Sequence, residues 1–539
     1  MKFLNNEFRL WKLMFSEPLN NVWNDKKFME KRSMKYLAHL GSLLIIICGI
    51  TLPLSGCGDD EGGIIEKPQV ELGVSDGTLD FEASGGSKEL KVTSNALWKF
   101  NYDVNLWSRP NIQTSKGDVT VQITADANET TEARSMVLKL AGEGVDTIQI
   151  TVNQAAGTID PEPVEPELPD YIDPDNTDMR NLTSVQLTEL MGVGWNLGNS
   201  LEAMIENGGI LSGNETSWGN PVVSKTLIDS VKAAGFNTIR IPVSWSHMFD
   251  DPATYKISYA WKQRVEEVVN YALDNDMFVM INIHWDGGWM DHPTYDQQNA
   301  INERITMMWK QIAKFFRDYD DRLLFAGTNE VHEEGDFNAP TAEYAEVQNS
   351  FNQTFVNTVR ATGGRNTYRH LIVQTYVTNI AYGVDHMTIP SDDTADRLMV
   401  EVHFYDPYQF ALQNTDEISL WGAANAGSAA HAGWGDEDWV DEQFSNVKTN
   451  FVDKGYGVIL GEYSPTLKTN PANSTYEEHV TSRNYYINYV TKTALTNGMV
   501  PVFWDNGHTG NYGSGLFNRN TGEIVHAGAV DAVISALGK

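Results

Sequence analysis

Residues 261–283 decide the fold, because the amphipathic stretch WKQRVEEVVNYAL at 261–273 leads into the apolar run FVMINI at 278–283. The periodicity of the first stretch is typical of a helix, and a short apolar run bounded by polar residues is typical of a buried strand. The same alternation recurs from about Asn176 to Lys539. Repeated units of this kind predict a parallel sheet.

Eight strand candidates follow this pattern within residues 176–539. They end near Asn196, Ile241, Ile283, Thr328, Gln374, His403, Gly461 and Trp504. A length of about 360 residues suits eight strand–helix units with enlarged loops. The sequence therefore predicts an α/β fold, a (β/α)8 TIM barrel, over residues 176–539.

A different pattern precedes the barrel. Short alternating runs, such as LKV at 90–92 and IQITV at 148–152, are separated by Gly, Asn, Asp and Ser. They predict a small all-β, immunoglobulin-like sandwich over residues 66–156. Its Trp98 and Trp107 either bind glycan or form the core, and we favour the core. Residues 157–175 combine five prolines with acidic residues, which predicts an extended linker.

The N-terminus is typical of a targeting segment. The apolar run at 43–54 follows Lys31, Arg32 and Lys35 and is too short to span a bilayer. It ends in LSGC at 54–57, which resembles the lipobox of bacterial lipoproteins. Residues 1–57 are therefore predicted to be a leader and signal peptide with Cys57 as the lipidated residue. The acidic GDDE at 58–61 resembles the surface-export signal of Bacteroidetes lipoproteins, so we expect the protein at the cell outer membrane, lipid-anchored and surface-exposed.

Composition restricts the partners. The chain has 39 Lys and Arg against 72 Asp and Glu, a formal net charge of −33, which repels nucleic-acid phosphates and anionic lipid head groups. Neutral partners fit this charge better, and membrane contact is expected through the lipid anchor only. The two cysteines, Cys48 and Cys57, provide no disulfide framework.

Polar residues follow or end nearly every predicted strand of the barrel. In a (β/α)8 barrel the reactive groups lie at the C-terminal ends of the strands, so these residues should meet at one mouth. The candidate site residues are Asn196, Arg240, His284, Asn329, Glu330, His403, Tyr405, Glu462 and Trp504.

Two carboxylates at one mouth point to glycoside hydrolysis. One carboxyl group protonates the leaving oxygen while the other attacks or stabilises the anomeric carbon. Arg240 and Tyr405 could hydrogen-bond to Glu462 and keep it ionised, while Glu330 stays protonated. Asn329 could hold a substrate hydroxyl group.

The chain resembles glycoside hydrolase family 5 over essentially all of residues 176–539. The family's recurrent set appears in order as Arg240, His284, Asn329, Glu330, His403, Tyr405, Glu462 and Trp504. The resemblance implies a retaining (β/α)8 enzyme with Glu330 as acid/base and Glu462 as nucleophile, and with the other candidates binding substrate. No metal-ligand spacing such as His-Glu-x-x-His occurs, since VHEE at 331–334 lacks a second histidine, so we expect no metal and no cofactor.

Finer motifs resemble subfamily 4, which contains endoglucanases and many xyloglucanases. They are GWNLGN at 194–199, WGNP at 218–221, FVNTVRATGG at 355–364 and WDNG at 504–507. The β-domain resembles the BACON domain through SNALW at 94–98 and VNQ at 152–154. Together with the lipoprotein leader, these features resemble the surface xyloglucan-specific endo-β-1,4-glucanases of gut Bacteroidetes, so xyloglucan is the expected partner of a monomeric enzyme.

Some alternatives stay open. Val331, Trp285 and the pair Tyr463-Ser464 depart from the family pattern, which puts substrate contacts in question. A cellulase or mannanase uses the same eight residues, and a non-catalytic surface glycan-binding lipoprotein shares the leader and the aromatic residues. Loop aromatics could form sugar platforms or simply pack the loops. They are Trp285, Trp289, Tyr408, Trp421 and Trp434.

Overall fold

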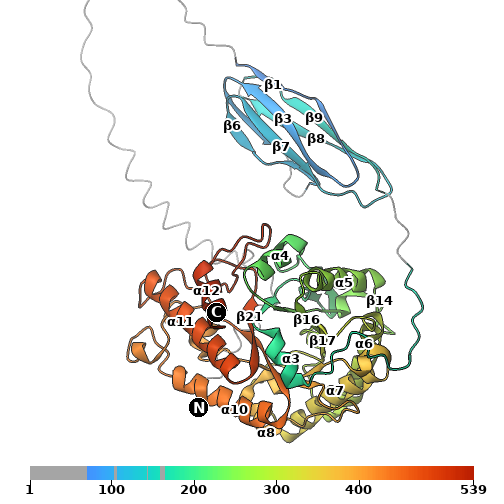
Figure 1. Ribbon diagram of the computed structural model, residues 1–539. Coiled ribbons are helices and arrows are strands. Elements are labelled where there is room, and N and C mark those ends of the chain that lie inside the picture. The colour runs from blue at the N-terminus through green and yellow to red at the C-terminus, as the bar shows by residue number, and fades with distance from the viewer. Residues whose placement is uncertain (1–69, 102–105, 143, 158–163, 539) are drawn as a thin grey trace, which may run out of the picture. The chain divides into compact units, whose positions relative to one another are not determined.

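The computed structural model describes residues 70–101, 106–142, 144–157 and 164–538 (Figure 1). The predicted leader at 1–57, with Cys57, lies outside these residues. The chain divides into two compact units between Val164 and Glu165, and each unit has its own hydrophobic core.

The N-terminal unit is a sandwich of two sheets, as predicted. Its four-stranded sheet has the order β1 (Leu72–Val74), β3 (Gly86–Ser94), β7 (Val119–Ala125), β5 (Ser108–Pro110). Its five-stranded sheet has the order β2 (Thr78–Phe81), β9 (Ile148–Gln154), β8 (Arg134–Gly142), β4 (Leu97–Asn101), β6 (Thr114–Lys116). Trp98 is 1% exposed in the core. Trp107 packs against that core with the Arg134 guanidinium 4.4 Å from its ring centroid, so both tryptophans serve packing.

The second unit is a closed barrel of eight parallel strands, which confirms the predicted (β/α)8 fold. The strands follow one another in chain order, and the last pairs with the first. They are β10 (Gly194–Leu197), β13 (Thr238–Ile241), β16 (Phe278–Asn282), β17 (Leu323–Ala326), β18 (Leu371–Gln374), β19 (Leu398–His403), β20 (Gly457–Tyr463) and β21 (Met499–Asp505).

The barrel interior is apolar at the end where the strands begin. Alternate side chains of each strand point inward, and here they form one buried cluster. Its members are Phe278, Met280, Leu324, Ala326, Ile372, Met399, Ile459, Val500 and Val502, with Leu187 and Met191 of helix α3 (Ser184–Met191). Thr183 and Gln186 form a capping box that starts α3. Helix α3 therefore closes this end of the barrel.

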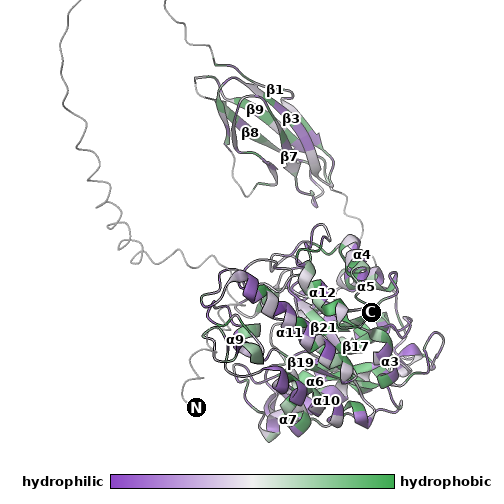
Figure 2. Cartoon of the chain, turned by 60° about the vertical axis from the view of Figure 1, so that its left-hand side comes forward, coloured by the Kyte–Doolittle hydropathy of each residue, from purple (hydrophilic) through white to green (hydrophobic). Residues whose placement is uncertain are grey.

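Helices cover the outside of the barrel because each buries one apolar face against the strands. The longer ones are α4 (Lys225–Ala233), α5 (Tyr259–Leu273), α6 (Tyr295–Phe315), α7 (Ala342–Arg360), α8 (Ile380–His386), α10 (Glu437–Asn450), α11 (Tyr476–Thr496) and α12 (Ala527–Ser535). Figure 2 shows hydrophilic colour on outer helices such as α10 and α11. The short elements are α9 (Tyr408–Ala411) and the hairpins β11 (Ile205–Asn207) with β12 (Ile210–Ser212) and β14 (Phe249–Asp251) with β15 (Lys256–Ile257).

Part of the segment predicted as linker packs on the barrel. Asp170 forms ion pairs with Lys310 and Lys314 at 2.7 and 2.9 Å, and Ile172 makes a β-bridge to Gly363. The barrel unit accordingly begins at Glu165 rather than at 176. The acidic and apolar residues of this segment have partners on the barrel surface, which proline content alone does not reveal.

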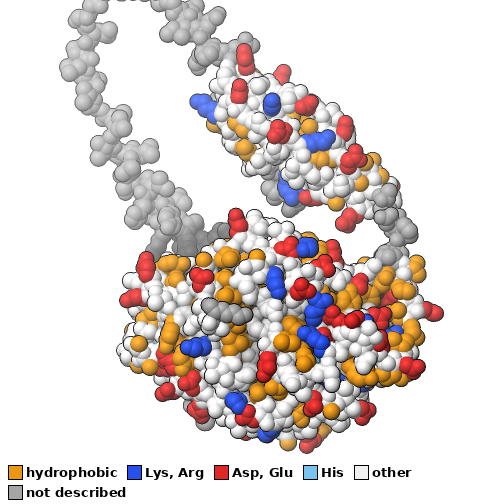
Figure 3. Space-filling model, viewed as in Figure 1, with side chains coloured by type: hydrophobic (Ala, Val, Ile, Leu, Met, Phe, Trp, Pro, Cys, Tyr) orange, Lys and Arg blue, Asp and Glu red, His pale blue; other side chains and the backbone are white. Residues whose placement is uncertain are grey.

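The visible face of both units carries more acidic than basic side chains (Figure 3), in keeping with the strong negative charge of the chain. Within the described ranges, no helix combines the length and the apolar character that a bilayer crossing requires.

Candidate active site

The strand register brings the predicted site residues to one mouth of the barrel. Asn196 of β10 lies beside Arg240 of β13 and beside Trp504 of β21, and His403 of β19 lies beside Glu462 of β20. The other candidates follow strands directly. They are His284 after β16, Asn329 and Glu330 after β17, and Tyr405 after β19.

Arg240 organises the floor of the mouth. Its Nη1 donates to Glu462 Oε1 at 2.9 Å and to Asn196 Oδ1 at 3.0 Å, and its Nη2 donates to Asn329 Oδ1 at 2.7 Å. The guanidinium is 1% exposed, so these contacts are shielded from water. Because Asn329 accepts through its Oδ1, its Nδ2 is directed away from Arg240.

Glu462 is held from two sides. Besides the contact with Arg240, it accepts a hydrogen bond from the Tyr405 hydroxyl at 2.9 Å on its other oxygen. Its side chain is 7% exposed. These two predicted contacts are present, and they fix the orientation of this carboxylate.

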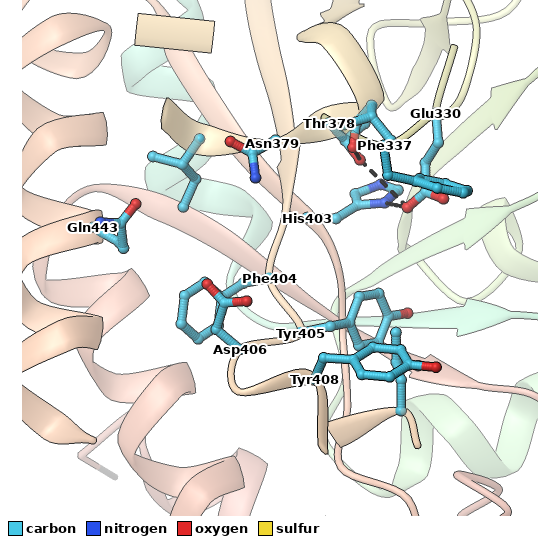
Figure 4. A pocket seen from close by; sticks show the side chains of 13 residues that line it. Glu330, Phe337, Thr378, Asn379, His403, Phe404, Tyr405, Asp406, Tyr408 and Gln443 are labelled. Carbon is cyan, nitrogen blue, oxygen red and sulfur yellow. Dashed lines mark hydrogen bonds and ion pairs between the residues drawn. The ribbon is translucent and has the colours of Figure 1, made fainter. Parts of the chain in front are cut away.

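Glu330 is more open, with a side chain that is 26% exposed. Its Oε1 accepts hydrogen bonds from His403 Nδ1 at 2.5 Å and from the Thr378 hydroxyl at 3.3 Å (Figure 4). One carboxylate oxygen of Glu330 lies within 4.8 Å of one of Glu462. Retaining glycosidases hold their two carboxyl groups about 5–5.5 Å apart, whereas inverting enzymes need about 6.5–9.5 Å. The observed spacing fits the retaining geometry.

A third carboxylate, that of Glu401, supports the pair from below. Its Oε1 lies 2.8 Å from Arg240 Nε and 3.2 Å from His403 Nε2, and its Oε2 accepts from Gln374 Nε2 at 2.7 Å. Burial alone would raise the pKa of Glu401, but the Arg240 charge and the His403 hydrogen bond lower it to about 2. Glu401 is therefore ionised and fixes the positions of both cations.

Glu401 has room only because residue 461 is a glycine. A Cβ atom at Gly461 would lie 2.0 Å from Glu401 Oε1, far inside any allowed contact. The backbone carbonyl of Gly461 also accepts a hydrogen bond from Asn196 Nδ2 at 2.8 Å. The residue before the candidate nucleophile thus shapes the charge network.

His403 carries the positive charge next to the two candidate catalytic groups. Burial alone would lower its pKa, but the charges of Glu462 and Glu330 raise the pKa of His403 to about 9. For a carboxyl group burial acts in the opposite direction and would raise the pKa of Glu330, yet the hydrogen bond from His403 lowers that pKa below its ordinary value. Burial raises the pKa of Glu462, and its cationic neighbours only partly offset this effect.

These directions differ from the expectation that Glu330 stays protonated while Glu462 is kept ionised. The reason is the direct contact between Glu330 and the protonated His403, which stabilises the Glu330 carboxylate in the free site. The cluster holds three carboxylates (Glu330, Glu401, Glu462) and two cations (Arg240, His403). One negative charge is thus left unbalanced, and it favours retention of a proton within the cluster.

A metal site is the other chemistry to consider here. In the described part of the chain, one set of side chains has ligand-type atoms close enough to hold a metal ion, and it consists of Glu330, His403 and Glu462. Arg240 and the protonated His403 place positive charge there, which opposes binding of a cation. The geometry therefore fits acid/base chemistry better than metal ligation.

Thr378 reaches Glu330 from an unusual backbone turn. Val377 and Thr378, both β-branched, have φ angles of 47° and 51°. Such conformations cost on the order of 1–3 kcal/mol per residue and are kept only where the surroundings impose them. Here the Val377 N–H donates to Val331 O at 3.0 Å, which ties this loop to the segment that carries Glu330.

His284 and Trp504 form an aromatic wall at the mouth. Their rings are stacked with centroids 5.8 Å apart and an interplanar angle of 8°. Burial, together with the charges of Arg240 and His403, lowers the pKa of His284 well below its ordinary value, so the ring is neutral. A neutral stacked wall suits the apolar face of a sugar ring.

The five loop aromatics differ in their surroundings. Trp421 is 1% exposed and packs in the core, and Trp289 donates to Asp286 at 2.7 Å while Arg304 stacks on its ring, so both serve loop packing. Tyr408 lines a pocket next to Glu330 (Figure 4), and Trp434 is 39% exposed. Trp285 lies near Trp218, with ring centroids 6.3 Å apart.

Sequence reasoning missed Glu401, Gln374 and Thr378. Glu401 lies two residues before His403, and in a strand such a spacing places both side chains on one face. A polar residue within an apolar strand, in phase with a candidate site residue, was therefore an available signal. Thr378 offered none, because its contact depends on a left-handed backbone turn.

Comparisons with known proteins identify the family. Residues 203–510 match the family described as cellulase, glycosyl hydrolase family 5. A xyloglucan-specific endo-β-1,4-glucanase of Bacteroides ovatus is 44% identical over 519 residues, which cover 94% of this chain and 100% of that protein.

Solved structures are similar as well. A Bacteroides ovatus GH5 xyloglucanase in complex with a XXXG heptasaccharide superimposes with a TM-score of 0.66 at 44% identity, over 87% of this chain and 100% of that chain. A GH5-4 broad specificity endoglucanase from Clostridium cellulovorans gives a TM-score of 0.59 at 36% identity, over 68% of this chain and 99% of that chain.

The family match spans more than half of the 539 residues and includes Arg240, Glu330 and Glu462. The Bacteroides ovatus relative is covered over its full length. The chain therefore belongs to glycosyl hydrolase family 5, the cellulase family.

Proposed function

We propose that the chain is a retaining endo-β-1,4-glucanase in which Glu462 is the nucleophile and Glu330 the acid/base. The observation that carries this proposal is the spacing of the two carboxylates, within 4.8 Å, at the mouth of the barrel. The two have different surroundings: Glu462 is fixed by Arg240 and Tyr405, whereas Glu330 is more exposed and can meet a leaving group.

In the first step, a Glu462 oxygen forms a bond to the anomeric carbon while the bond from that carbon to the glycosidic oxygen breaks. Glu330 gives its proton to the departing oxygen. A proton for this step is available on His403 Nδ1, which hydrogen-bonds to Glu330 and is protonated at neutral pH. Tyr405 and Arg240 hold the attacking carboxylate in line.

In the second step, Glu330 removes a proton from water as the water oxygen attacks the anomeric carbon. The ester bond to Glu462 breaks, and the product leaves with its original configuration. Asn329, whose Oδ1 is occupied by Arg240, directs its Nδ2 toward a sugar hydroxyl group.

Xyloglucan is the proposed substrate, and subfamily 4 the proposed placement. The support is the 44% identity to a xyloglucan-specific relative and the similarity to xyloglucanase structures. Broad specificity endoglucanases are also similar, at 36% identity, so a plain β-1,4-glucanase is the second candidate.

Hydrolysis of xyloglucan, mixed-linkage glucan, carboxymethylcellulose and mannan separates these candidates. We expect the highest kcat/KM on xyloglucan, with a rapid fall in viscosity that marks endo cleavage. Proton NMR should show the β-anomer of the new reducing end first. Early α-anomer contradicts the retaining mechanism, and preference for mannan contradicts the substrate.

The β-sandwich is proposed to be a BACON-like spacer. Trp98 and Trp107 support this role, because both pack in the sandwich instead of forming a sugar platform. Removal of residues 58–164, which leaves the barrel unit from Glu165 onward, should change kcat/KM on soluble polymer less than about twofold. A large rise in KM would identify a substrate-binding module instead.

Anchoring through Cys57 at the outer membrane is also proposed, together with a monomeric state. Both rest on the sequence, since Cys57 lies outside the described residues. Several acyl chains, at about 0.8 kcal/mol per buried CH₂, would hold the protein stably in the bilayer. Cys57→Ser should move the protein from the membrane fraction to the soluble fraction. Failure of labelled fatty acid to enter the unsubstituted protein would refute the anchor.

A further inference from the structure

A pocket of about 210 Å³ has Glu330 in its lining, with Gln443 on the side away from Glu330 (Figure 4). It runs between the loop after β18 and the loop after β19 and ends at Gln443 of helix α10. We call it the side pocket, with Glu330 at one end and Gln443 at the other.

The side pocket adjoins the proposed acid/base and not the proposed nucleophile. Glu330 and its partner His403 line it, whereas Glu462 does not. Because the acid must face the departing oxygen, a space that opens at Glu330 receives part of the sugar attached to that oxygen. The aromatic wall of His284 and Trp504 is not part of this pocket.

The direction of the side pocket suits a branch better than a backbone. A linear glucan crosses the mouth from one side to the other, whereas this pocket is lined by the two loops and by Gln443 of α10. Its volume is enough for a single sugar ring and too small for a chain. A substituent on the leaving-side unit could therefore enter it while the backbone stays in the mouth.

The polar groups of the side pocket are not all satisfied by the protein. Gln443 is only 8% exposed, and its amide makes no hydrogen bond to any residue that the structure describes, but it is reachable from the pocket. Water can satisfy such an amide in the free enzyme, and a hydroxyl group of a ligand can replace that water. Gln443 is thus available to both donate to and accept from a hydroxyl group.

Two further groups face the same space. Asn379 uses its Oδ1 to cap helix α8, accepting from the Tyr382 N–H at 3.1 Å, and its Nδ2 points into the pocket (Figure 4). Asp406 accepts from Trp439 Nε1 through one carboxylate oxygen at 3.0 Å. Apolar walls from Phe337, Ile380 and Leu412 complete the lining, a combination that fits the hydroxyl groups and C–H faces of a neutral sugar.

We propose that the side pocket binds a neutral monosaccharide branch carried by the leaving-side unit of a β-1,4-glucan. This inference rests on the proposed function, which it extends from the backbone to the branch. An acidic branch is disfavoured by Asp406, and an unbranched chain would make no contact with the Gln443 amide.

The test uses two oligosaccharides with the same glucan backbone, one with a xylosyl branch on the leaving-side unit and one without. Gln443→Leu removes the amide at similar volume. It should lower kcat/KM on the branched compound about 5- to 10-fold, the loss expected for one hydrogen bond, and change the unbranched value less than twofold. Asn446→Leu, an exposed site on the same helix, is the matched control and should alter neither.

Asn379→Ser is a second variant, because a serine hydroxyl oxygen can still cap α8 while the amide donor into the pocket is removed without a change of charge. It should also lower the ratio of branched to unbranched activity. Equal losses on both compounds, or no loss on either, would overturn the inference while leaving the proposed function intact. Failure of the unsubstituted enzyme to cut xyloglucan would instead overturn the proposed function and this inference with it.

Discussion

The two ends of the barrel interior are lined by the same eight strands but differ in the side chains that face inward. Where the strands begin, Met280, Leu324 and Met399 form an apolar cluster closed by α3. Where they end, Arg240 and Glu401 lie buried among other charged and amide groups.

The difference separates stability from chemistry along one set of strands. Burying an apolar side chain contributes about 1.5–3 kcal/mol, whereas burying a charge costs several kcal/mol unless it is paired. The free energy gained at the apolar end can therefore offset the cost of burying the charged groups at the other end. Substitutions at the two ends should change different observables.

Glu462→Ala should have the largest effect on activity. Without the nucleophile no glycosyl-enzyme forms, so kcat on every substrate should fall at least about 10⁴-fold, as for other catalytic groups that act as a unit. The melting temperature should stay close to that of the original enzyme. Azide should restore turnover and give a product of inverted configuration. A product of retained configuration would assign the nucleophile elsewhere.

Glu330→Ala should have the next largest effect on activity. On polysaccharide, loss of the acid/base should lower kcat about 10²- to 10⁴-fold. An aryl glycoside with an activated leaving group needs little protonation, so its first step should survive and a burst of released phenol should appear. Azide should then give a product of retained configuration. Equal losses on aryl and natural substrates would contradict the acid role.

Glu401→Gln should act through pH. The pKa of Glu401 is lowered to about 2, so its charge contributes stability above its ordinary pKa of 4.5, and this contribution is lost as the pH falls toward 2. The variant should have a flatter stability curve in that window. Loss of this acceptor should also lower the pKa of His403 from about 9 and move the alkaline limit of activity downward.

At neutral pH, Glu401→Gln should lower kcat/KM about tenfold, which is equivalent to one lost charged hydrogen bond. Glu442→Gln on α10 is exposed and serves as the control. An unchanged pH profile with the same loss of activity would make Glu401 a purely structural residue.

Met399→Ala tests the apolar end and should change activity least. Removing a fully buried methionine should lower the free energy of unfolding by about 2–5 kcal/mol, measured by denaturant unfolding. The kcat value should stay within about twofold below the melting temperature. Met307→Ala, at a site 40% exposed, is the control and should change neither. A large loss of kcat would show that the two ends are coupled.

The barrel was predictable because its parallel strands are buried on both faces and read as short apolar runs. The placement of the candidate site was predictable because polar groups follow these runs, so the convergence of Arg240, Glu330 and Glu462 could be read from their positions. Glu401 was not recognised, since it lies inside a strand. The order of the Glu330 and Glu462 pKa values depends on a hydrogen bond from His403 that no sequence pattern specifies.

Gly461 has a consequence for how this enzyme can be changed. The Glu401 carboxylate occupies the space that a side chain at position 461 would need. Even alanine there would displace this carboxylate, which holds Arg240 and His403. A library that randomises the residues around the nucleophile and selects for any β-glucan should recover only glycine at this position. A substitution at position 461 therefore requires a matching change at Glu401, whereas the loops can vary independently of this charge network.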